Sequence, residues 1–560
     1  MPLGDLGVIS LAYGVNHYEV DKPYDRLLGV FSREKADFRT LGEFAGRELY
    51  EAAYWVDRFS NPYLYTWSIL GERADLSLLA PEERRVLEKL VVDFGVNRHP
   101  FEGRPWHNHY TALYLIGDPG ISCILTITIQ TAYALYKYAE GELRDYYKGL
   151  AGIEKPPLWG ATWFTEVQGG SDLGANTTTA KLVNGKYELY GYKYFASGAG
   201  IADIALATAR LPGSRPGAKG LSLFAVPRVN SRGELNYHVR RLKWKSGTVP
   251  VPTGEVEFTG AEAYLLGEPD KGIYYTLEDL MVSRLANSIG ALGIARKAYI
   301  EAYGYSSIRR AFGKRLVEHP LALRDLVDME AEIEAMTALT LYTISLFDSA
   351  WGSRPPYDAK YHYARLMTHI VKNMTAETSA RITQTAMELL GGIGFLHEFA
   401  VERWHREALI TPIWEGTSNI QALDMLEAMY KKRAHEELVK STEEIASASP
   451  EPALAEKALQ RIRDEINRAA SNPGQAEYFA KDILRGIGAA SAVILLLEGA
   501  RHTGDESFVT AAKYYYETRL EGKHARPLER REALELASLR GALDEIDWEA
   551  KAREALHLTR

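Results

Sequence analysis

A single carboxylate stands in an expected loop between an aromatic residue and a glycine. Glu415 lies between Trp414 and Gly416, just before a helix that Thr417 or Ser418 is expected to cap. Apolar surroundings raise the pKa of a carboxyl group, and a carboxylate in such a place can act as a general base. An acidic residue also stabilises a helix N-terminus, so the residues alone leave both interpretations open.

Two further segments could hold a flat or phosphorylated ligand. The first, Thr165-Glu166-Val167-Gln168-Gly169-Gly170-Ser171-Asp172, follows an expected strand at residues 161–164. Paired glycines let the backbone pass close to a ligand, but an ordinary turn capped by Ser171 is the better interpretation of this loop alone. In the second segment, residues 191–198, Phe195 and Ser197 share one face of a strand, and simple cross-strand packing also explains them.

Cations and glycines also gather near expected helix ends. The segment Arg309-Arg310-Ala311-Phe312-Gly313-Lys314-Arg315 can clamp a diphosphate or complement a helix C-terminus. Gly391-Gly392-Ile393-Gly394 has the glycines of a dinucleotide site but follows a helix, so a Rossmann site is not expected. His107 and His109 have no further ligands nearby in the sequence, and no histidine spacing indicates zinc, so no metal is expected.

The composition limits the class of protein. At 560 residues and 62.6 kDa, the chain is expected to form about two to four domains. A net charge of −8 and a pI of about 6.0 give no global basic field that would attract nucleic acid or anionic lipid. The single cysteine, Cys123, excludes an intramolecular disulfide and fits a reducing cytoplasm.

No signal peptide or membrane span is expected. The N-terminus lacks a basic start followed by an apolar run. The most apolar stretch, residues 121–135, is interrupted by threonines and a glutamine and is shorter than the roughly 20 residues of a membrane span. It is therefore expected to be a buried helix of a cytoplasmic protein.

The hydrophobic periodicity changes twice along the chain. Residues 1–157 have a mostly helical pattern, for example at 41–59 and 81–96. Residues 158–270 have a period of two, with a hairpin signal at Asn184-Gly185. Strands are expected at residues 179–183, 186–190, 204–209, 221–226 and 254–258. Because no helices alternate with them, we expect a small antiparallel barrel or sandwich.

The helical period returns in residues 271–438. Helices expected at 273–311, 321–351, 357–390 and 418–438 indicate a bundle. Residues 439–452, rich in Ser, Glu and Ala, are expected to be a linker before a helical extension at 453–560. The predicted fold class is therefore α+β and multidomain, with an N-terminal helical domain, a central antiparallel β-barrel or sandwich, a C-terminal helical bundle and a helical extension.

These signals are weak one by one, but over residues 150–430 their order and spacing resemble the acyl-CoA dehydrogenase superfamily. The resemblance rests on Thr165-Glu166-x-x-Gly169-Gly170-Ser171-Asp172, the strand from Lys193 to Ser197, Arg309-x-x-Phe312-Gly313, Leu390-Gly391-Gly392-x-Gly394-Phe395 and Ile413-x-Glu415-Gly416-Thr417-x-x-Ile420-Gln421. The chain length, the helical extension and the residues Gly169-Gly170 and Phe195-Ala196-Ser197 make it most similar to the AidB branch, the adaptive-response flavoproteins.

The resemblance implies FAD held between the β-domain and the bundle. Thr165 and Ser171 would contact the flavin ring and diphosphate region together with Phe164 and Gly170, Phe195 would lie beside the ring, and Ser197 near N5. Arg309, Phe312, Gly391 and Gly392 match positions that reach the FAD of a neighbouring subunit, and Thr417 and Asn419 match the adenosine end. A homo-oligomer, either a tetramer or a dimer of dimers, is therefore implied.

The resemblance further implies that Glu415 is the catalytic base acting on an acyl-CoA thioester. It would remove the pro-R α-proton while the β-hydride passes to the flavin, and its backbone N–H would polarise the thioester carbonyl. Some members carry the base just before the arginine matched by Arg284, a predicted substrate residue, but Met281-Val282-Ser283 contain no carboxylate. Glu388 stands where many members have Gln, at part of the contact with the neighbouring FAD.

Three functions are compatible with these residues. The predicted one is an acyl-CoA dehydrogenase that passes electrons to an electron-transfer flavoprotein; the alternatives are an acyl-CoA oxidase and a DNA-associated protective flavoprotein. Residues 431–560 carry 21 Lys plus Arg against 23 Asp plus Glu, whereas a DNA-binding domain normally shows a basic excess. The locally basic segment at 524–531 is short, so DNA is the less favoured partner.

Overall fold

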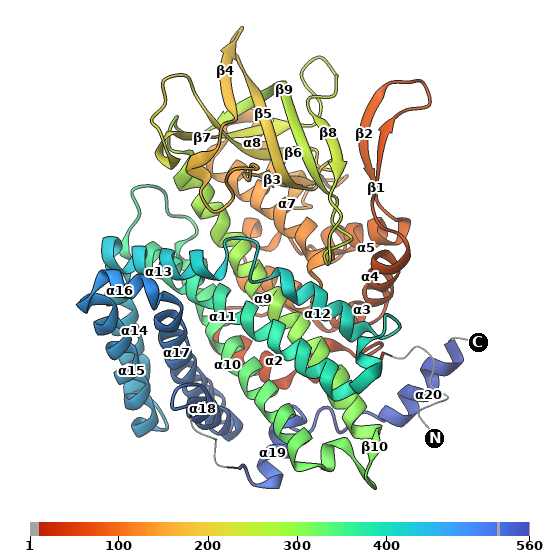
Figure 1. Ribbon diagram of the computed structural model, residues 1–560, viewed down its shortest axis with the longest axis vertical. Coiled ribbons are helices and arrows are strands. Elements are labelled where there is room, and N and C mark those ends of the chain that lie inside the picture. The colour runs from red at the N-terminus through yellow and green to blue at the C-terminus, as the bar shows by residue number, and fades with distance from the viewer. Residues whose placement is uncertain (1–9, 523–526, 559–560) are drawn as a thin grey trace. The chain divides into compact units, whose positions relative to one another are not determined.

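The structure is a computed structural model that describes residues 10–522 and 527–558 (Figure 1). The chain divides into two compact units, each made of segments that are not contiguous in sequence. Unit 1 comprises Met1–Tyr50, Pro105–Asp118 and Asn287–Arg560, and unit 2 comprises Glu51–Arg104 and Pro119–Ala286. The helices α4 (Glu48–Phe59) and α9 (Gly272–Ile308) each contribute residues to both units.

Unit 2 contains a closed β-barrel. Its strands are β3 (Gly160–Trp163), β4 (Thr179–Val183), β5 (Lys186–Ser197), β6 (Ile204–Arg210), β7 (Leu221–Pro227), β8 (His238–Leu242) and β9 (Thr253–Leu266). They hydrogen-bond in the order β3-β6-β4-β5-β9-β7, β8 pairs with β9, and a β6–β7 pairing closes the ring. The predicted barrel is confirmed, although β8 was not predicted.

Two pairings in the barrel differ from the antiparallel arrangement that the sequence predicts. β3 pairs with β6 in parallel, and β4 meets β6 in parallel at a single position, Thr179 opposite Arg210. Parallel neighbours need a long connection, and the β4–β5 hairpin lies between β3 and β6 in the chain and supplies it. The short strands and tight turns alone do not reveal this crossing.

The β4–β5 hairpin forms where the turn residues predict it. Asn184 and Gly185 have φ values of 51° and 83°, the two positive values that a type I′ turn requires. The register places Thr179 opposite Tyr190 and Val183 opposite Lys186. β5 then continues to Ser197, so the predicted flavin-facing segment belongs to the longer strand of this hairpin.

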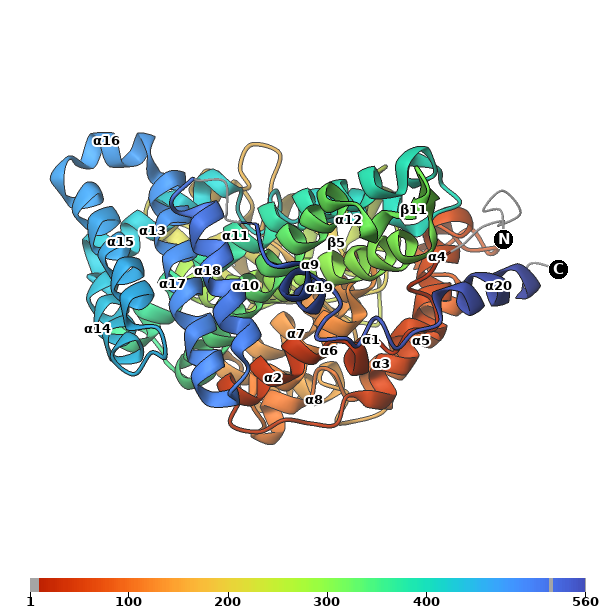
Figure 2. The same ribbon diagram turned by 90° about the horizontal axis from the view of Figure 1, so that it is seen from below.

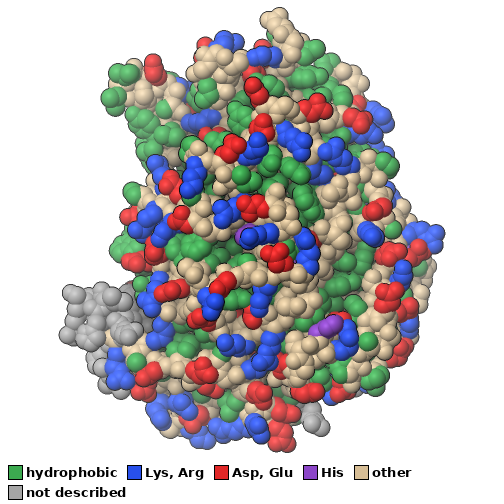
Figure 3. Space-filling model, turned by 180° about the vertical axis from the view of Figure 1, so that it is seen from behind, with side chains coloured by type: hydrophobic (Ala, Val, Ile, Leu, Met, Phe, Trp, Pro, Cys, Tyr) green, Lys and Arg blue, Asp and Glu red, His purple; other side chains and the backbone are tan. Residues whose placement is uncertain are grey.

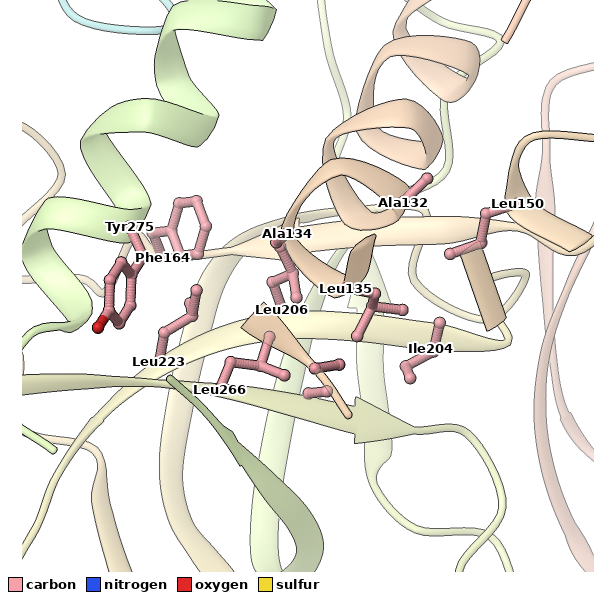
Figure 4. Close-up of a cluster of buried hydrophobic side chains, with 12 residues drawn as sticks. Ala132, Ala134, Leu135, Leu150, Phe164, Ile204, Leu206, Leu223, Leu266 and Tyr275 are labelled. Atoms are coloured by element: carbon pink, nitrogen blue, oxygen red, sulfur yellow. The ribbon is translucent and has the colours of Figure 1, made fainter. Parts of the chain in front are cut away.

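The helix α7 (Pro119–Tyr138) and the barrel share a hydrophobic core (Figure 4). Ala132 and Leu135 of α7 meet Leu206, Leu223 and Leu266 of three strands. Residues 121–135 therefore form a buried helix, as predicted. Two other α-helices lie entirely within unit 2, α5 (Pro81–Val92) and α8 (Gly141–Leu150).

A two-stranded hairpin, β1 (Tyr63–Trp67) and β2 (Arg73–Leu78), was not predicted in a part of the chain expected to be helical. The buried residues of β2 are Asp75 and Ser77, whereas the alternating Leu76 and Leu78 are exposed. Ser77 N donates to the Gly200 carbonyl at 3.1 Å. The hairpin is thus anchored by its polar positions, so its apolar alternation does not mark a core-facing strand.

Unit 1 is a helical bundle. α10 (Pro320–Ala350) packs against α11 (Ala359–Leu390), and α11 packs against α12 (Ala400–Ile410) and α13 (Ser418–Lys432). The predicted helices at 273–311, 321–351 and 357–390 are confirmed, while α12 was not predicted. The other helices are α1 (His17–Val20), α2 (Lys22–Phe31), α3 (Arg39–Gly46) and α6 (Trp106–Ile116).

The C-terminal extension packs onto the same bundle (Figure 2). Its helices are α14 (Ala434–Ser447), α15 (Pro452–Ser471), α16 (Pro473–Tyr478), α17 (Ala480–Thr503), α18 (Glu506–Arg519), α19 (Arg530–Ala537) and α20 (Trp548–Leu558). The predicted linker at residues 439–452 is wrong, because α14 occupies most of it. Leu438, Thr442 and Ala446 are buried four residues apart, a helical face that the Ser, Glu and Ala content hides.

Within residues 10–522 and 527–558, one helix has the length and composition of a membrane span, and it is α17 rather than the helix that contains residues 121–135. Its mean hydropathy reaches 1.7, and 89% of that window is buried inside the protein. Such burial is the pattern of a core helix. Of the basic segment at 524–531, residues 524–526 lie outside the described residues.

Candidate active site

Glu415 lies in the connection between α12 and α13 in unit 1. Its φ of 57° is in the left-handed region, and that of Gly416 is 91°. A non-glycine residue in this region costs about 1–3 kcal/mol and persists only where its surroundings hold it. Strained residues of this kind cluster at active sites, so the backbone geometry marks Glu415 independently of its charge.

Buried side chains hold the peptide groups around Glu415. Lys372 Nζ of α11 donates to the Gly416 carbonyl at 2.6 Å. Gln421 Nε2 of α13 donates to the carbonyls of Glu415 at 2.9 Å and Gly416 at 3.0 Å. The indole N–H of Trp414 donates to Asn287 Oδ1 of α9. Glu415 is half-buried, and these hydrogen bonds hold the backbone segment that carries it.

The two residues predicted for the adenosine end start the next helix. Thr417 is the N-cap residue of α13, as predicted, but its hydroxyl makes no capping hydrogen bond. Asn419 is exposed in the first turn. Thr417 is half-buried, so the polar groups of both side chains are accessible to solvent.

Arg309 and Phe312 belong to a cationic hairpin that follows α9. β10 (Arg310–Ala311) pairs with β11 (Lys314–Arg315), and the turn residues Phe312 and Gly313 have φ values of 49° and 81°. Phe312 is 97% exposed at the tip. An aromatic ring held in solvent on a strained turn between four cations is costly for a monomer and suits a residue that another molecule covers.

Gly391 and Gly392 are exposed at the end of α11. Gly391 has a φ of 70°, and a side chain on either glycine would meet no atom within 4 Å. Glycine at both positions therefore leaves an open backbone surface that a ligand could approach closely. Glu388 is exposed and accepts a hydrogen bond from Gln384 Nε2 at 3.3 Å.

The glycine loop of unit 2 is organised by a buried ion pair that the sequence does not predict. Glu166 accepts hydrogen bonds from Lys193 Nζ at 2.8 Å, Thr177 N at 2.7 Å and Thr178 Oγ1 at 2.6 Å. Burial alone raises the pKa of Glu166, but the Lys193 ammonium and the hydrogen bonds outweigh it and lower the pKa to about 2. Burial lowers the pKa of Lys193, and Glu166 opposes that shift.

The loop and the end of β5 form one surface. Tyr194 N donates to the Thr165 carbonyl at 3.0 Å, which ties the strand to the loop. Phe195 is 54% exposed, and the Ser197 hydroxyl lies 3.2 Å from that of Thr253. Gly170 and Ser171 are exposed. An open ring next to hydroxyl groups and a glycine turn fits the ring and phosphate chemistry of a flavin nucleotide.

Phe164 occupies a different place from the other predicted cofactor residues. Its side chain is in the hydrophobic core shown in Figure 4, and its carbonyl accepts a hydrogen bond from Asn176 Nδ2 at 2.7 Å. Because the Phe164 side chain packs in this core, the geometry does not support a contact between this side chain and the cofactor.

Arg284 is buried on the part of α9 that belongs to unit 2, at 3% exposure. Two carboxylates lie one to two turns before it. Glu278 accepts hydrogen bonds from Lys137 Nζ and from the hydroxyls of Tyr133 and Tyr138, and Gln130 Nε2 donates to Asp279 at 3.1 Å. These carboxylates are engaged in buried hydrogen bonds within unit 2.

The histidines of α6 are part of a core. His107 and His109 are at most 1% exposed, and His107 Nε2 lies 3.0 Å from the Leu341 carbonyl. Burial lowers the pKa of His107 to about 4, which keeps it neutral near pH 7. The pair packs inside unit 1.

Family models match two parts of the chain. The acyl-CoA dehydrogenase middle domain matches residues 161–261, and the acyl-CoA dehydrogenase C-terminal domain matches residues 270–430. An acyl-CoA dehydrogenase of Bacillus subtilis is 31% identical over 388 residues, which cover 69% of this chain and 94% of that protein. The chain therefore belongs to the acyl-CoA dehydrogenase family of FAD-dependent oxidoreductases, and FAD is its cofactor.

Two further relatives extend the match beyond these domains. The putative acyl-CoA dehydrogenase AidB of Escherichia coli is 31% identical over 371 residues, 64% of this chain and 66% of AidB. The crystal structure of Caenorhabditis elegans ACDH-11 in complex with C11-CoA has 25% identity and a TM-score of 0.81, and covers 92% of this chain and 93% of that chain. The predicted fold class and the likeness to AidB are confirmed.

Proposed function

We propose that this protein dehydrogenates an acyl-CoA thioester between its α and β carbons, with Glu415 as the base. The observation that carries the proposal is the left-handed backbone of Glu415, held by hydrogen bonds to the carbonyls of Glu415 and Gly416. A fixed backbone at Glu415 limits the positions that its carboxylate can take, which favours proton transfer from a bound substrate. The C11-CoA bound to the ACDH-11 relative supports a thioester as substrate.

In the proposed reaction Glu415 takes the pro-R α-proton of the thioester. Because this proton is weakly acidic, the thioester carbonyl needs hydrogen-bond donors as enolate character develops, and the backbone N–H of Glu415 is the donor that this chain supplies. Bound FAD supplies the acceptor for the β-hydride. The electron pair of the α-C–H bond becomes the new carbon–carbon double bond, and the proton stays on a carboxyl oxygen of Glu415.

Each unit carries residues that we propose contact the cofactor. In unit 2 these are Thr165, Gly170, Ser171, Phe195 and Ser197, whose hydroxyls, backbone and exposed ring suit a flavin nucleotide. In unit 1, Thr417 and Asn419 offer polar groups for the adenosine end. Arg284 would assist substrate binding.

We further propose that the protein is a homo-oligomer in which one subunit contributes to the FAD site of the next. The supporting observations are the 97% exposed Phe312, the exposed Arg309 beside it, and the open glycines Gly391 and Gly392. A guanidinium group pairs well with a diphosphate, and an exposed ring can cover a flat ligand. These are the features that the family resemblance assigns to a neighbouring subunit.

A panel of acyl-CoAs tests the proposal. Straight-chain and branched thioesters, with chains around C11 included, are mixed anaerobically with the wild-type enzyme, Glu415→Gln and the control Glu456→Gln. Glu456 is an exposed carboxylate on α15 that pairs with Arg463 at 3.1 Å. We expect at least one thioester to bleach the flavin of the wild type and of the control but not of Glu415→Gln. If no thioester bleaches the wild-type flavin, the proposal fails.

The same samples separate the alternatives. Slow reoxidation in air that needs an added electron acceptor supports a dehydrogenase that uses an electron-transfer flavoprotein, whereas rapid reoxidation with peroxide release supports an oxidase. On the face of the protein shown in Figure 3, Lys and Arg are interspersed with Asp and Glu. Because the net charge is −8 and residues 431–560 carry no basic excess, we expect no DNA shift at low salt in a gel assay.

A further inference from the structure

Three helices of unit 1 meet the segment that carries Glu415, each through one buried polar side chain. Asn287 of α9 is 6% exposed, and Lys372 of α11 and Gln421 of α13 are fully buried. Asn287 contacts the residue before Glu415, Lys372 contacts the residue after it, and Gln421 contacts Glu415 itself and Gly416. Together the three side chains hold residues 414–416, and we refer to them as the Glu415 clamp.

The chemistry of each contact fixes its direction. The Trp414 indole N–H can only donate, so the oxygen of the Asn287 amide must face it. The carbonyls of Glu415 and Gly416 can only accept, so the Gln421 nitrogen faces them and its Oε1 accepts from His369 Nδ1, 2.9 Å away. Lys372 has no acceptor group and donates to the Gly416 carbonyl. No contact in the clamp can reverse without losing a hydrogen bond.

The clamp stabilises the backbone conformation of Glu415, which determines the direction of its carboxylate. Glu415 is in the left-handed region, where a residue with a side chain stays only if other contacts hold it. The two carbonyls that the clamp holds belong to the Glu415–Gly416 and Gly416–Thr417 peptide groups. The contact with Asn287 holds the side chain of Trp414, the residue before Glu415. Loss of one contact lets these peptides rotate toward a more ordinary φ, which moves the carboxylate and the backbone N–H of Glu415 together.

The geometry points to Asn287, Lys372 and Gln421 as positioning residues for Glu415. They contact neither the acyl-CoA nor the cofactor in this role; they keep the base and its backbone N–H aligned. This inference rests on the proposed function of Glu415. Because a misplacement of about 1 Å can cost about 100-fold in rate, each loss is expected to slow the proton-abstraction step rather than weaken substrate binding.

The kinetic test uses Lys372→Met, Gln421→Leu and Asn287→Leu in the FAD-loaded enzyme. Anaerobic flavin reduction is followed over a range of acyl-CoA concentrations. We expect the limiting rate to fall about 10- to 100-fold in each variant, with the half-saturating acyl-CoA concentration within about threefold of the wild type. A limiting rate within threefold of the wild type in both Lys372→Met and Gln421→Leu overturns the inference.

A matched control separates positioning from general destabilisation. Lys297→Met also removes a buried lysine of a bundle helix that donates to a backbone carbonyl, that of Ile116, outside the Glu415 segment. We expect Lys297→Met to keep the wild-type limiting rate at a temperature where all variants are folded. An equal rate loss in Lys297→Met and Lys372→Met shows that buried lysines matter only for stability, which contradicts the clamp.

A second readout does not depend on turnover. Hydrogen–deuterium exchange of residues 411–421 is measured in the wild type and the same variants without acyl-CoA. Faster exchange in Lys372→Met and Gln421→Leu but not in Lys297→Met supports the clamp, and unchanged exchange overturns it. If no thioester reduces the wild-type flavin, the proposed function fails while this exchange measurement still decides whether the clamp exists.

Discussion

Replacing Lys193 by Met is expected to destabilise unit 2, because it leaves the Glu166 carboxylate buried without its cation. The side chains of Lys193 and Glu166 are 0% and 2% exposed, so water cannot replace the lost partner. Breaking a buried ion pair from one side costs about 3–5 kcal/mol. The hydrogen bonds from Thr177 and Thr178 to Glu166 remain, which keeps the expected cost within this range.

This cost translates into a measurable shift of the melting temperature. Unit 2 contains about 220 residues, and unfolding entropy of about 2.1 cal/mol/K per residue gives about 0.5 kcal/mol per kelvin for a unit of that size. A loss of about 3–5 kcal/mol therefore lowers the melting temperature of unit 2 by about 6–10 °C. Removing both charges in Lys193→Met/Glu166→Gln should cost less than the sum of the single changes.

The assay is thermal unfolding of the wild type, Lys193→Met, Glu166→Gln and the double variant. The pKa of Glu166 is lowered to about 2, below its value in the unfolded chain, so the pair stabilises fully above about pH 4.5 and its contribution is lost as the pH falls toward 2. The difference in melting temperature between the wild type and Lys193→Met should therefore become smaller as the pH falls from about 4.5 to 2. A shift below about 2 °C at pH 7, or strictly additive single effects, would refute the reasoning.

Three other changes have defined expectations. Gly488→Ala should cost about 1–3 kcal/mol in thermal unfolding, because its Cβ would lie 2.7 Å from Cγ2 of the branched Ile370 as well as 2.0 Å from Met374 Sδ; no loss would show that α11 and α17 pack more loosely. Burial lowers the pKa of His17 to about 3, so the free energy of unfolding should decline as the pH falls below about 6.5. The decline should be less steep in His17→Gln. Denaturant titrations that give the same dependence of this free energy on pH in both proteins would contradict the expectation. Phe312→Ala should change stability by less than about 0.5 kcal/mol because the ring is 97% exposed, yet should lower the FAD retained on gel filtration; full flavin content would argue against its proposed role.

The sequence predicted those features that depend on local patterns. The Asn184-Gly185 turn, the long bundle helices and the end of α11 at Gly391 each follow from residues that are adjacent in the chain. The order of the motifs also led to the family, which the comparisons confirm. Local chemistry and periodicity were sufficient for these conclusions.

The features that the sequence did not predict depend on contacts between distant residues. Lys193 and Glu166 are 27 positions apart, and Lys372 and Gly416 are 44 apart, so no local spacing links either pair. The β1–β2 hairpin buries its polar positions, which inverts the usual signal of a strand. The linker predicted at 439–452 is helical because its small and polar residues still leave one face that packs. The roles assigned to the site residues remain predictions.

The central claim is that Glu415 removes the α-proton. Its most direct test is the rate of anaerobic flavin reduction by the best acyl-CoA in the wild type and in Glu415→Gln, with acyl-CoA binding measured in the same samples. A positioned general base contributes about 100- to 10,000-fold, so the account predicts a fall of that size with acyl-CoA still bound. Reduction of the flavin in Glu415→Gln at the wild-type rate would contradict the account.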